Sequence, residues 1–155
     1  MPISANVPAP EFNLPDETGA MHSLSEYRGR PVVLYFYPRD DTPGCTTEAC
    51  NFRDDYKVYD ESGVVVLGVS PDSVKSHAKF KEKYHLPFPL LADEGHKVCD
   101  LYGVWGEKKF AGKTSMGVLR TTFLIGPEGV ILKVFENVKP EGHSTEVLAA
   151  LKEAV

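Results

Sequence analysis

The stretch from Tyr35 to Asp54 reads Tyr-Phe-Tyr-Pro-Arg-Asp-Asp-Thr-Pro-Gly-Cys-Thr-Thr-Glu-Ala-Cys-Asn-Phe-Arg-Asp. An apolar strand pattern ends at Pro38, and a polar loop follows it. Thr42 can cap a helix, and Pro43 suits the first helical position, where the missing N–H of proline costs nothing. The stretch therefore predicts a strand, a loop and a helix whose first turn contains Cys45.

The segments on both sides of this stretch continue the alternation of strands and helices. Upstream, the continuous apolar run Pro31–Tyr37 is typical of a strand that is covered on both faces of a sheet. Downstream, we expect the helix to extend to about Glu61, the next buried strand to span Gly63–Ser70, and an amphipathic helix to span 72–84. That second helix is expected to direct three apolar side chains toward the core: Val74, Ala78 and Phe80.

The rest of the chain completes an α/β pattern. In chain order we expect a short strand, a short helix, a long loop, two strands and a closing helix: Pro89–Ala92, His96–Tyr102, Gly103–Gly117, Val118–Ile125, Val130–Glu136 and Ser144–Ala154. Gly126-Pro-Glu-Gly129 predicts an antiparallel turn between the last two strands, and Glu11–Leu14 with Ala20–Ser23 predicts another hairpin near the N-terminus. The order β-α-β followed by β-β-α predicts a thioredoxin-like α/β fold with an N-terminal β-hairpin extension and inserted elements.

Length and charge narrow the classes of function. The chain has 155 residues and a net charge of −5, and we expect one domain over residues 1–155. Acids and bases are mixed without a basic cluster, which argues against a nucleic-acid partner. Residues 1–10 lack the pattern of a signal peptide and no run approaches membrane-spanning length, so we expect no membrane association and a cytoplasmic location. Three cysteines fit a compartment in which disulfides are transient.

Cys45 is the strongest candidate for a reactive group. The free N–H groups and the positive end of the dipole at a helix N-terminus favour a thiolate over a thiol, and the thiolate is the nucleophile. The alternative is a buried cysteine that packs as a small hydrophobic side chain. The Pro-Gly approach and the position at the helix start favour the reactive thiol.

Cys50 follows five residues later on the same predicted helix. If both residues are helical, their Cα atoms lie roughly 9 Å apart, whereas a disulfide needs a Cα separation below about 7 Å. A bond between Cys45 and Cys50 would therefore require the first turns of the helix to unwind. The spacing alone leaves it equally open that Cys50 simply packs inside the protein.

A cation is needed if a thiolate is to be held against an oxygen-rich substrate. Arg120 is the one charge within Val118–Ile125, and a guanidinium can donate several hydrogen bonds in a fixed geometry. An ordinary edge-strand charge that faces solvent is the equal alternative. Glu48 lies one turn after Cys45 and could orient that arginine, or could simply be an acid favoured in the first turn of a helix.

The sequence resembles a known family at this point. Pro38-Arg-Asp-Asp-Thr42-Pro-Gly-Cys45 matches the peroxiredoxin active-site pattern Pro-x-x-x-Thr-x-x-Cys. The surrounding Thr-Pro-Gly-Cys-Thr-Thr-Glu-Ala-Cys, the stretch 98–108 and Arg120 are similar to the bacterioferritin-comigratory, or PrxQ, subfamily. The likeness covers essentially the whole chain, and it implies a thiol peroxidase without a bound metal, haem, flavin or nicotinamide.

The resemblance also implies a role for each matching residue. Cys45 would attack hydrogen peroxide or an organic hydroperoxide and become a sulfenic acid, which Cys50 would resolve as an intramolecular disulfide. Pro38 would shield Cys45, Thr42 would hydrogen-bond to a substrate oxygen, and Arg120 would stabilise the thiolate and the polarised O–O bond. Thioredoxin or a related dithiol protein would then reduce the disulfide. We expect a monomer or a weak dimer.

Other interpretations remain open from sequence alone. A redox-regulated interaction or holdase protein could use the same pair of cysteines as a switch without turnover. A dithiol–disulfide oxidoreductase is disfavoured, because four residues rather than two separate Cys45 from Cys50. Cys99 lies three residues after His96, but two ligands are too few for a metal site. We favour a packing role for Cys99, with an alternative resolving role as the competing hypothesis.

Overall fold

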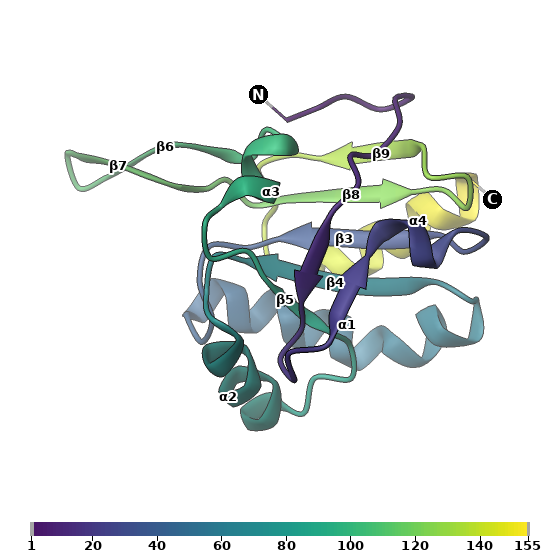
Figure 1. Cartoon of the computed structure of the whole chain (residues 1–155), viewed down its shortest axis with the longest axis horizontal. Coiled ribbons are helices and arrows are strands. Elements are labelled where there is room, and N and C mark those ends of the chain that lie inside the picture. Colours follow the sequence, from purple (N-terminus) through teal and green to yellow (C-terminus); the bar gives the residue numbers. More distant parts are fainter. Residues whose placement is uncertain (1, 155) are drawn as a thin grey trace.

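A central five-stranded mixed sheet organises the protein (Figure 1), which is described by a computed structural model for residues 2–154. Its strands in spatial order are β5 (Leu90–Ala92), β4 (Val65–Ser70), β3 (Val32–Phe36), β8 (Thr121–Ile125) and β9 (Ile131–Phe135). The β3–β4 and β4–β5 pairs are parallel, whereas the β3–β8 and β8–β9 pairs are antiparallel. This topology confirms the predicted β-α-β unit followed by β-β-α.

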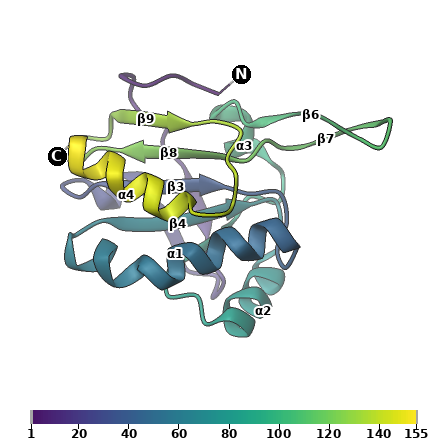
Figure 2. The ribbon, with the colours of Figure 1, turned by 180° about the vertical axis from the view of Figure 1, so that it is seen from behind.

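Helices and a small hairpin cover the two faces of the sheet (Figures 1 and 2). One face is covered by α1 (Pro43–Glu61), α2 (Val74–Tyr84) and α4 (His143–Ala154). The other is covered by the N-terminal arm, the hairpin of β1 (Asn13–Pro15) and β2 (Met21–Ser23), the 3₁₀ helix η1 (Leu24–Tyr27) and α3 (Lys97–Leu101). No helix within residues 2–154 is long and apolar enough to cross a membrane.

The central strand β3 supplies side chains to both cores. Val33 and Tyr35 pack with α1 and α4, whereas Leu34 and Phe36 pack on the opposite face. All of them are fully buried, as expected when successive side chains of a doubly covered strand alternate between two apolar layers. The continuous apolar run in the sequence is thereby explained.

The expected long loop over Gly103–Gly117 is instead mostly a β-hairpin. Strands β6 (Trp105–Phe110) and β7 (Lys113–Val118) pair in antiparallel register. Ala111 and Gly112 form the turn between them, both with positive φ, as two-residue hairpin turns require. The hairpin projects from the end of the sheet where β3 ends and α1 begins (Figures 1 and 2). The loop prediction failed because a hairpin with little buried surface lacks the apolar alternation that marks a strand.

The predicted strand Val118–Ile125 is also corrected. Val118 ends β7, β8 begins at Thr121, and Arg120 lies in the connection between them. That connection is held by backbone hydrogen bonds, because Leu119 donates to Val104 over 2.7 Å and the Arg120 carbonyl accepts from Val138 over 3.2 Å. Arg120 is therefore fixed at the end of the sheet and is not a residue of an edge strand.

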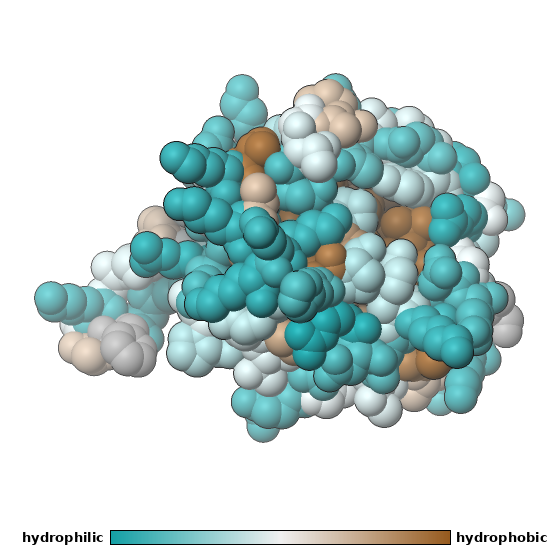
Figure 3. All heavy atoms as spheres, turned by 90° about the horizontal axis from the view of Figure 1, so that it is seen from below, coloured by the Kyte–Doolittle hydropathy of each residue, from teal (hydrophilic) through white to brown (hydrophobic). Residues whose placement is uncertain are grey.

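Helix α2 buries one of the three side chains expected in the core, Phe80, and one that was not expected, His77. His77 and Phe80 are buried, whereas Val74 and Ala78 are only half-buried. The lysines do face water as predicted, and the side of the protein that carries α2 is mainly hydrophilic (Figure 3). A pocket of about 400 Å³ on this side is lined by residues of α2 and of the loop that precedes α1.

The packing of Gly68 in β4 gives a test of the core. A Cβ atom at this position would lie 3.0 Å from the phenol ring of Tyr35 and from the side chain of Leu90, both of which are buried. We expect Gly68→Ala to lower the free energy of unfolding by about 1–3 kcal/mol in urea denaturation, because overpacking strains a dense core. Gly95→Ala is the control, since its Cβ would meet only Lys97, at 3.9 Å. Equal losses in both variants would contradict this account.

Candidate active site

The start of α1 sets the position of Cys45. Thr42 is the N-cap, Pro43 is the first helical residue, and the Thr42 carbonyl accepts the first helical hydrogen bond from Thr46 over 2.8 Å. The predicted helix start is therefore confirmed. The Thr42 side chain, however, does not cap the helix, because its hydroxyl donates to the Arg39 carbonyl over 2.9 Å.

This arrangement leaves two N–H groups available at the helix N-terminus. Within residues 2–154, neither the Gly44 nor the Cys45 backbone N–H has a hydrogen-bond acceptor. Unpaired N–H groups at the positive end of a helix dipole bind anionic or partly negative oxygen atoms. The first turn of α1 thus offers such a site directly beside the buried thiol of Cys45.

Arg120 approaches that thiol from the other side. Its Nη2 donates to Cys45 Sγ over 3.3 Å, and its Nη1 donates to Glu48 Oε1 over 2.7 Å. The Arg120 side chain is only 16% exposed and that of Glu48 is completely buried. These contacts bring together three residues that the sequence singled out, and they exclude the alternative of a solvent-facing charge at position 120.

Sheet register explains why Arg120 is close to α1. Phe36 at the end of β3 pairs with Thr121 at the start of β8. In an antiparallel pair, the residue before Thr121 lies at the same end of the sheet as the loop that leaves β3. Arg120 and the start of α1 are therefore neighbours, although they are far apart in the sequence.

Gly44 makes room for this contact. A Cβ atom at Gly44 would lie 3.1 Å from Arg120 Nη2 and 3.5 Å from Pro140 Cγ. A larger residue would thus press on the guanidinium in the position from which it reaches Cys45. In the sequence, Gly44 is recognisable only as part of the approach to the helix, because no local pattern reveals a contact made across the fold.

Glu48 and Arg120 form a buried salt bridge. Burial raises the pKa of Glu48 to about 7, although Arg120 works in the opposite direction. Glu48 Oε2 has no hydrogen-bond partner among the described residues, so Arg120 alone holds this carboxyl group. Burial also opposes the charge on Arg120, yet Glu48 and Cys45 raise its pKa. The guanidinium therefore stays cationic beside the thiol.

The remaining predicted site residues surround this centre less tightly. Pro38 and Cys50 are half-buried, and Pro38 begins the loop that leads to α1. Burial raises the pKa of Cys50, with a smaller opposing effect from Arg53. The structure is that of the reduced protein, because Cys45, Cys50 and the third cysteine are all free thiols.

Cys99 is separate from this site. It is completely buried in the core on the opposite face of the sheet from Cys45. Burial, with the nearby Asp93, raises the pKa of the Cys99 thiol far above its usual range. His96 stacks on Trp105 with ring centroids 3.9 Å apart and bonds to Asp100. These contacts agree with the packing role favoured for Cys99.

Comparison with known proteins now places the chain. Residues 5–134 match the model of the AhpC/TSA family. The chain belongs to the AhpC/TSA family. A putative peroxiredoxin bcp from Coxiella burnetii is 53% identical over 151 residues, which are 97% of this chain and 100% of the relative. Peroxiredoxin Bcp from Bacillus subtilis is 48% identical over 153 residues, covering 99% of this chain and 98% of the relative.

The fold is also similar to that of solved structures. A cysteine-to-serine mutant of peroxiredoxin Q from Xanthomonas campestris superposes with a TM-score of 0.91 and 39% identity, covering 99% of this chain and 100% of the other. The resemblance to Bcp and PrxQ peroxiredoxins and the thioredoxin-like fold are therefore confirmed. The protein is a peroxiredoxin, a thiol peroxidase that acts on a peroxide with a thiol reductant.

The raised pKa of Glu48 gives a prediction for stability. Burial raises the pKa of this carboxyl group from its ordinary value of 4.5 to about 7 in the folded protein. The folded state thus binds this proton more tightly, and the resulting stability is fully present below about pH 4.5 and is lost as the pH rises through about 7. A shift of this size corresponds to about 3 kcal/mol.

Glu48→Gln removes this titration while keeping the shape of the side chain. We expect the free energy of unfolding of the wild type, measured relative to Glu48→Gln, to fall by up to about 3 kcal/mol from acidic to mildly alkaline pH. Denaturant titrations of both proteins at a series of pH values measure this difference. A difference that does not change with pH would show that Glu48 titrates in the folded protein as it does in the unfolded chain.

Proposed function

We propose that this peroxiredoxin reduces hydrogen peroxide and organic hydroperoxides through Cys45, with Cys50 as the resolving cysteine. The observation that carries the proposal is the hydrogen bond of 3.3 Å from Arg120 to Cys45 Sγ at the start of α1. A guanidinium and the positive end of a helix both stabilise a thiolate. No other thiol in the described residues has both.

In the first step the Cys45 thiolate attacks the terminal peroxide oxygen. An S–O bond forms, the O–O bond breaks, and the leaving oxygen takes up a proton as water or an alcohol, so that Cys45 becomes a sulfenic acid. Arg120 and the unpaired N–H groups of Gly44 and Cys45 would hold the two peroxide oxygens as charge develops. Binding to preorganised donors of this kind lowers the activation barrier for breaking the O–O bond.

Thr42 and Pro38 complete the proposed peroxide site. The Thr42 hydroxyl donates its proton to the Arg39 carbonyl, which leaves its oxygen free to accept a hydrogen bond from the O–H of a peroxide. Pro38 is half-buried at the other end of the same loop, and an apolar ring there would limit access of water to Cys45. Both roles agree with the expectations from sequence.

In the second step the Cys50 thiol attacks the Cys45 sulfenic acid. An S–S bond forms and water leaves, which protects Cys45 from further oxidation. Both cysteines lie in α1, where a spacing of five residues separates Cα atoms by roughly 9 Å. The first turns of α1 must therefore unwind before the bond can form.

Phe52 sets a limit to this unwinding. Its ring is completely buried and stacks on Tyr35 with centroids 4.8 Å apart, while Tyr59, Phe88 and His143 pack around it. Before Phe52, the hydrogen bonds from α1 to other elements are those with Arg120 and one of 3.2 Å from Asn51 to the Pro140 carbonyl, and only Cys45 and Ala49 add small apolar side chains to the core. We expect α1 to unwind over residues 42–51 and to remain helical after Phe52.

A dithiol protein would complete the cycle. Unwinding would expose the half-buried Cys50, so that the disulfide becomes accessible to thioredoxin or a related reductant by thiol–disulfide exchange. We place this cycle in a reducing compartment such as the cytoplasm and assign it to a monomer or a weak dimer. Organic hydroperoxides are included because alkyl peroxide reduction is described for the Xanthomonas campestris bacterioferritin comigratory protein, which is 42% identical to this chain.

Three single-cysteine variants test the proposal. Cys45→Ser is expected to abolish peroxide consumption. Cys50→Ser should still react with the first equivalent of peroxide but lose sustained turnover with thioredoxin by a factor of about 100 or more, because its sulfenic acid has no resolving thiol. Cys99→Ala is the control and should keep both activities. Stopped-flow kinetics and mass spectrometry of the oxidised thiols provide the measurements.

The same experiment can refute the assignments separately. If Cys45→Ser retained the wild-type rate of peroxide consumption, Cys45 would not be the reacting thiol. If one equivalent of peroxide produced a Cys45–Cys99 disulfide, or none, in the wild type, Cys50 would not be the resolving residue.

A further inference from the structure

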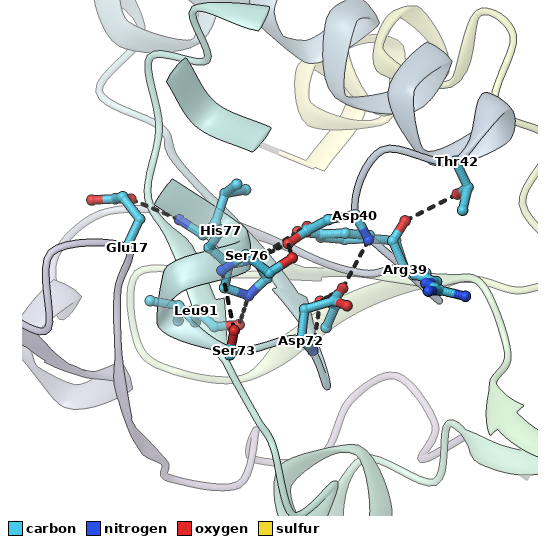
Figure 4. Close-up of polar contacts among 12 residues, drawn as sticks. Glu17, Arg39, Asp40, Thr42, Asp72, Ser73, Ser76, His77 and Leu91 are labelled. Atoms are coloured by element: carbon cyan, nitrogen blue, oxygen red, sulfur yellow. Dashed lines mark hydrogen bonds and ion pairs between the residues drawn. The ribbon is translucent and has the colours of Figure 1, made fainter. Parts of the chain in front are cut away.

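A buried polar network lies beside the loop that leads to Cys45 (Figure 4). Its centre is Asp40, which is 8% exposed. Asp40 Oδ1 accepts from the Tyr37 hydroxyl over 2.6 Å, and Oδ2 accepts from the Ser76 hydroxyl over 2.8 Å. Oδ2 also lies 2.7 Å from Nδ1 of His77, a completely buried residue of α2. The network thus joins the loop before α1 to α2.

The partners of His77 determine where its protons lie. Nε2 is 2.9 Å from the Leu91 carbonyl oxygen of β5, which can only accept, so Nε2 must carry a proton. Nδ1 faces Asp40 Oδ2, and the two carboxylate oxygens also accept from the Tyr37 and Ser76 hydroxyls. A hydrogen bond between Nδ1 and Oδ2 therefore ties the ring to this carboxyl group. His77 joins Asp40 on one side to β5 on the other.

The polar groups around His77 come from the neighbouring strands and loops. Tyr37 comes from the end of β3, Asp40 from the following loop, and Asp72 from the connection between β4 and α2, with its carboxylate within 4.8 Å of both partners. β5 presents only the Leu91 carbonyl. Two carboxyl groups thus lie close to one buried imidazole.

The same three residues could be mistaken for a metal site. Their ligand atoms lie within 4.8 Å of one another. Each is already satisfied, however, because Asp72 accepts from the Asp40 backbone N–H over 2.8 Å and from the Ser70 hydroxyl over 2.6 Å. These internal hydrogen bonds satisfy the network without an ion. The network holds the loop that precedes α1.

That loop carries two residues of the proposed peroxide site. Pro38 and Thr42 each lie two positions from Asp40, one on either side. The Asp40 side chain is held by His77 and its backbone N–H by Asp72. Asp41 adopts a positive φ of 56°, and its carboxylate accepts from Lys83 over 2.8 Å and from the Tyr84 hydroxyl over 3.0 Å, which adds a second tie between the loop and α2. The shape of the loop therefore depends on this anchoring.

We propose that His77 is a positioning residue for peroxide reduction, which anchors Asp40 through its hydrogen bond and so holds Pro38 and Thr42 in the places that receive the peroxide. This inference rests on the proposed function of Cys45. In this proposal His77 shapes the peroxide pocket, whereas Arg120 and the helix start stabilise the thiolate.

The test compares two reactions of the same thiol. Reaction with peroxide requires a correctly shaped pocket around Cys45, whereas alkylation by iodoacetamide requires only the Cys45 thiolate. We expect His77→Gln to lower the second-order rate constant for hydrogen peroxide by about 10- to 100-fold, because small displacements in a site have effects of this size. The rate of Cys45 alkylation should stay near that of the wild type.

Two further variants separate positioning from general stability. Asp40→Asn should reproduce the effect of His77→Gln, and the double variant should lose little more than either single one, because both act through one contact. Ser73→Ala is the control. It removes the N-cap hydrogen bond of 3.1 Å that Ser73 accepts from Ser76 without touching Asp40, and it should keep the ratio of the two rates.

Nitrogen-15 NMR of the wild-type histidines tests the contacts of His77 without any variant in the network. We expect a proton on Nε2 of His77, because this nitrogen faces the Leu91 carbonyl oxygen. An Nε2 without a proton, an unchanged ratio of rates in His77→Gln, or an alkylation rate that falls in step with the peroxide rate would each overturn the inference. If instead the wild type showed no fast reaction of Cys45 with peroxide, the proposed function itself would fail.

Discussion

One guanidinium connects the two buried acidic groups of this site. Arg120 donates to Cys45 Sγ and to Glu48 Oε1, and both partners belong to the first turns of α1. A buried anion without a partner is strongly unfavourable. The first turns of α1 can therefore keep a thiolate and a carboxylate inside the protein only while Arg120 stays in place. The pairing of β3 with β8 keeps it there.

The same arrangement suits the unwinding of α1 that the proposed cycle requires. Glu48 has a single partner and one unpaired oxygen among the described residues. In the proposed cycle, oxidation of Cys45 to a sulfenic acid would weaken its contact with Arg120, one of the few polar contacts that hold the start of α1. Phe52 is held separately, by the rings packed around it. Unwinding that follows the loss of this contact would therefore be limited to the segment that contains both cysteines.

Much of the fold followed from local patterns. The cap position of Thr42, the first helical proline and the doubly buried run of β3 are properties of neighbouring residues, and each was predicted correctly. The hairpin of β6 and β7 was missed because most of its side chains are not buried, so no apolar period marks its strands. Its two-residue turn depends on a positive φ at Ala111, which an alanine in the sequence does not indicate.

The site was less predictable, because its contacts cross the fold. Cys45 could be found from the helix start, but the proximity of Arg120 depends on strand register, and the need for Gly44 depends on Arg120. His77 gave no signal in a lysine-rich helix, although it lies three residues before the buried Phe80 and so on the same face. A polar side chain at a core position indicates a buried partner, and here that partner is Asp40, in the loop that leads to Cys45.

The most direct measurement of the central claim is the second-order rate constant of Cys45 with hydrogen peroxide in Arg120→Lys. Lysine keeps the positive charge but lacks the planar pair of donors that reaches Cys45 and Glu48 together. We expect the rate constant to fall by about 100-fold or more, with the protein still folded by circular dichroism. A folded Arg120→Lys protein that reacts with peroxide as fast as the wild type would contradict the account.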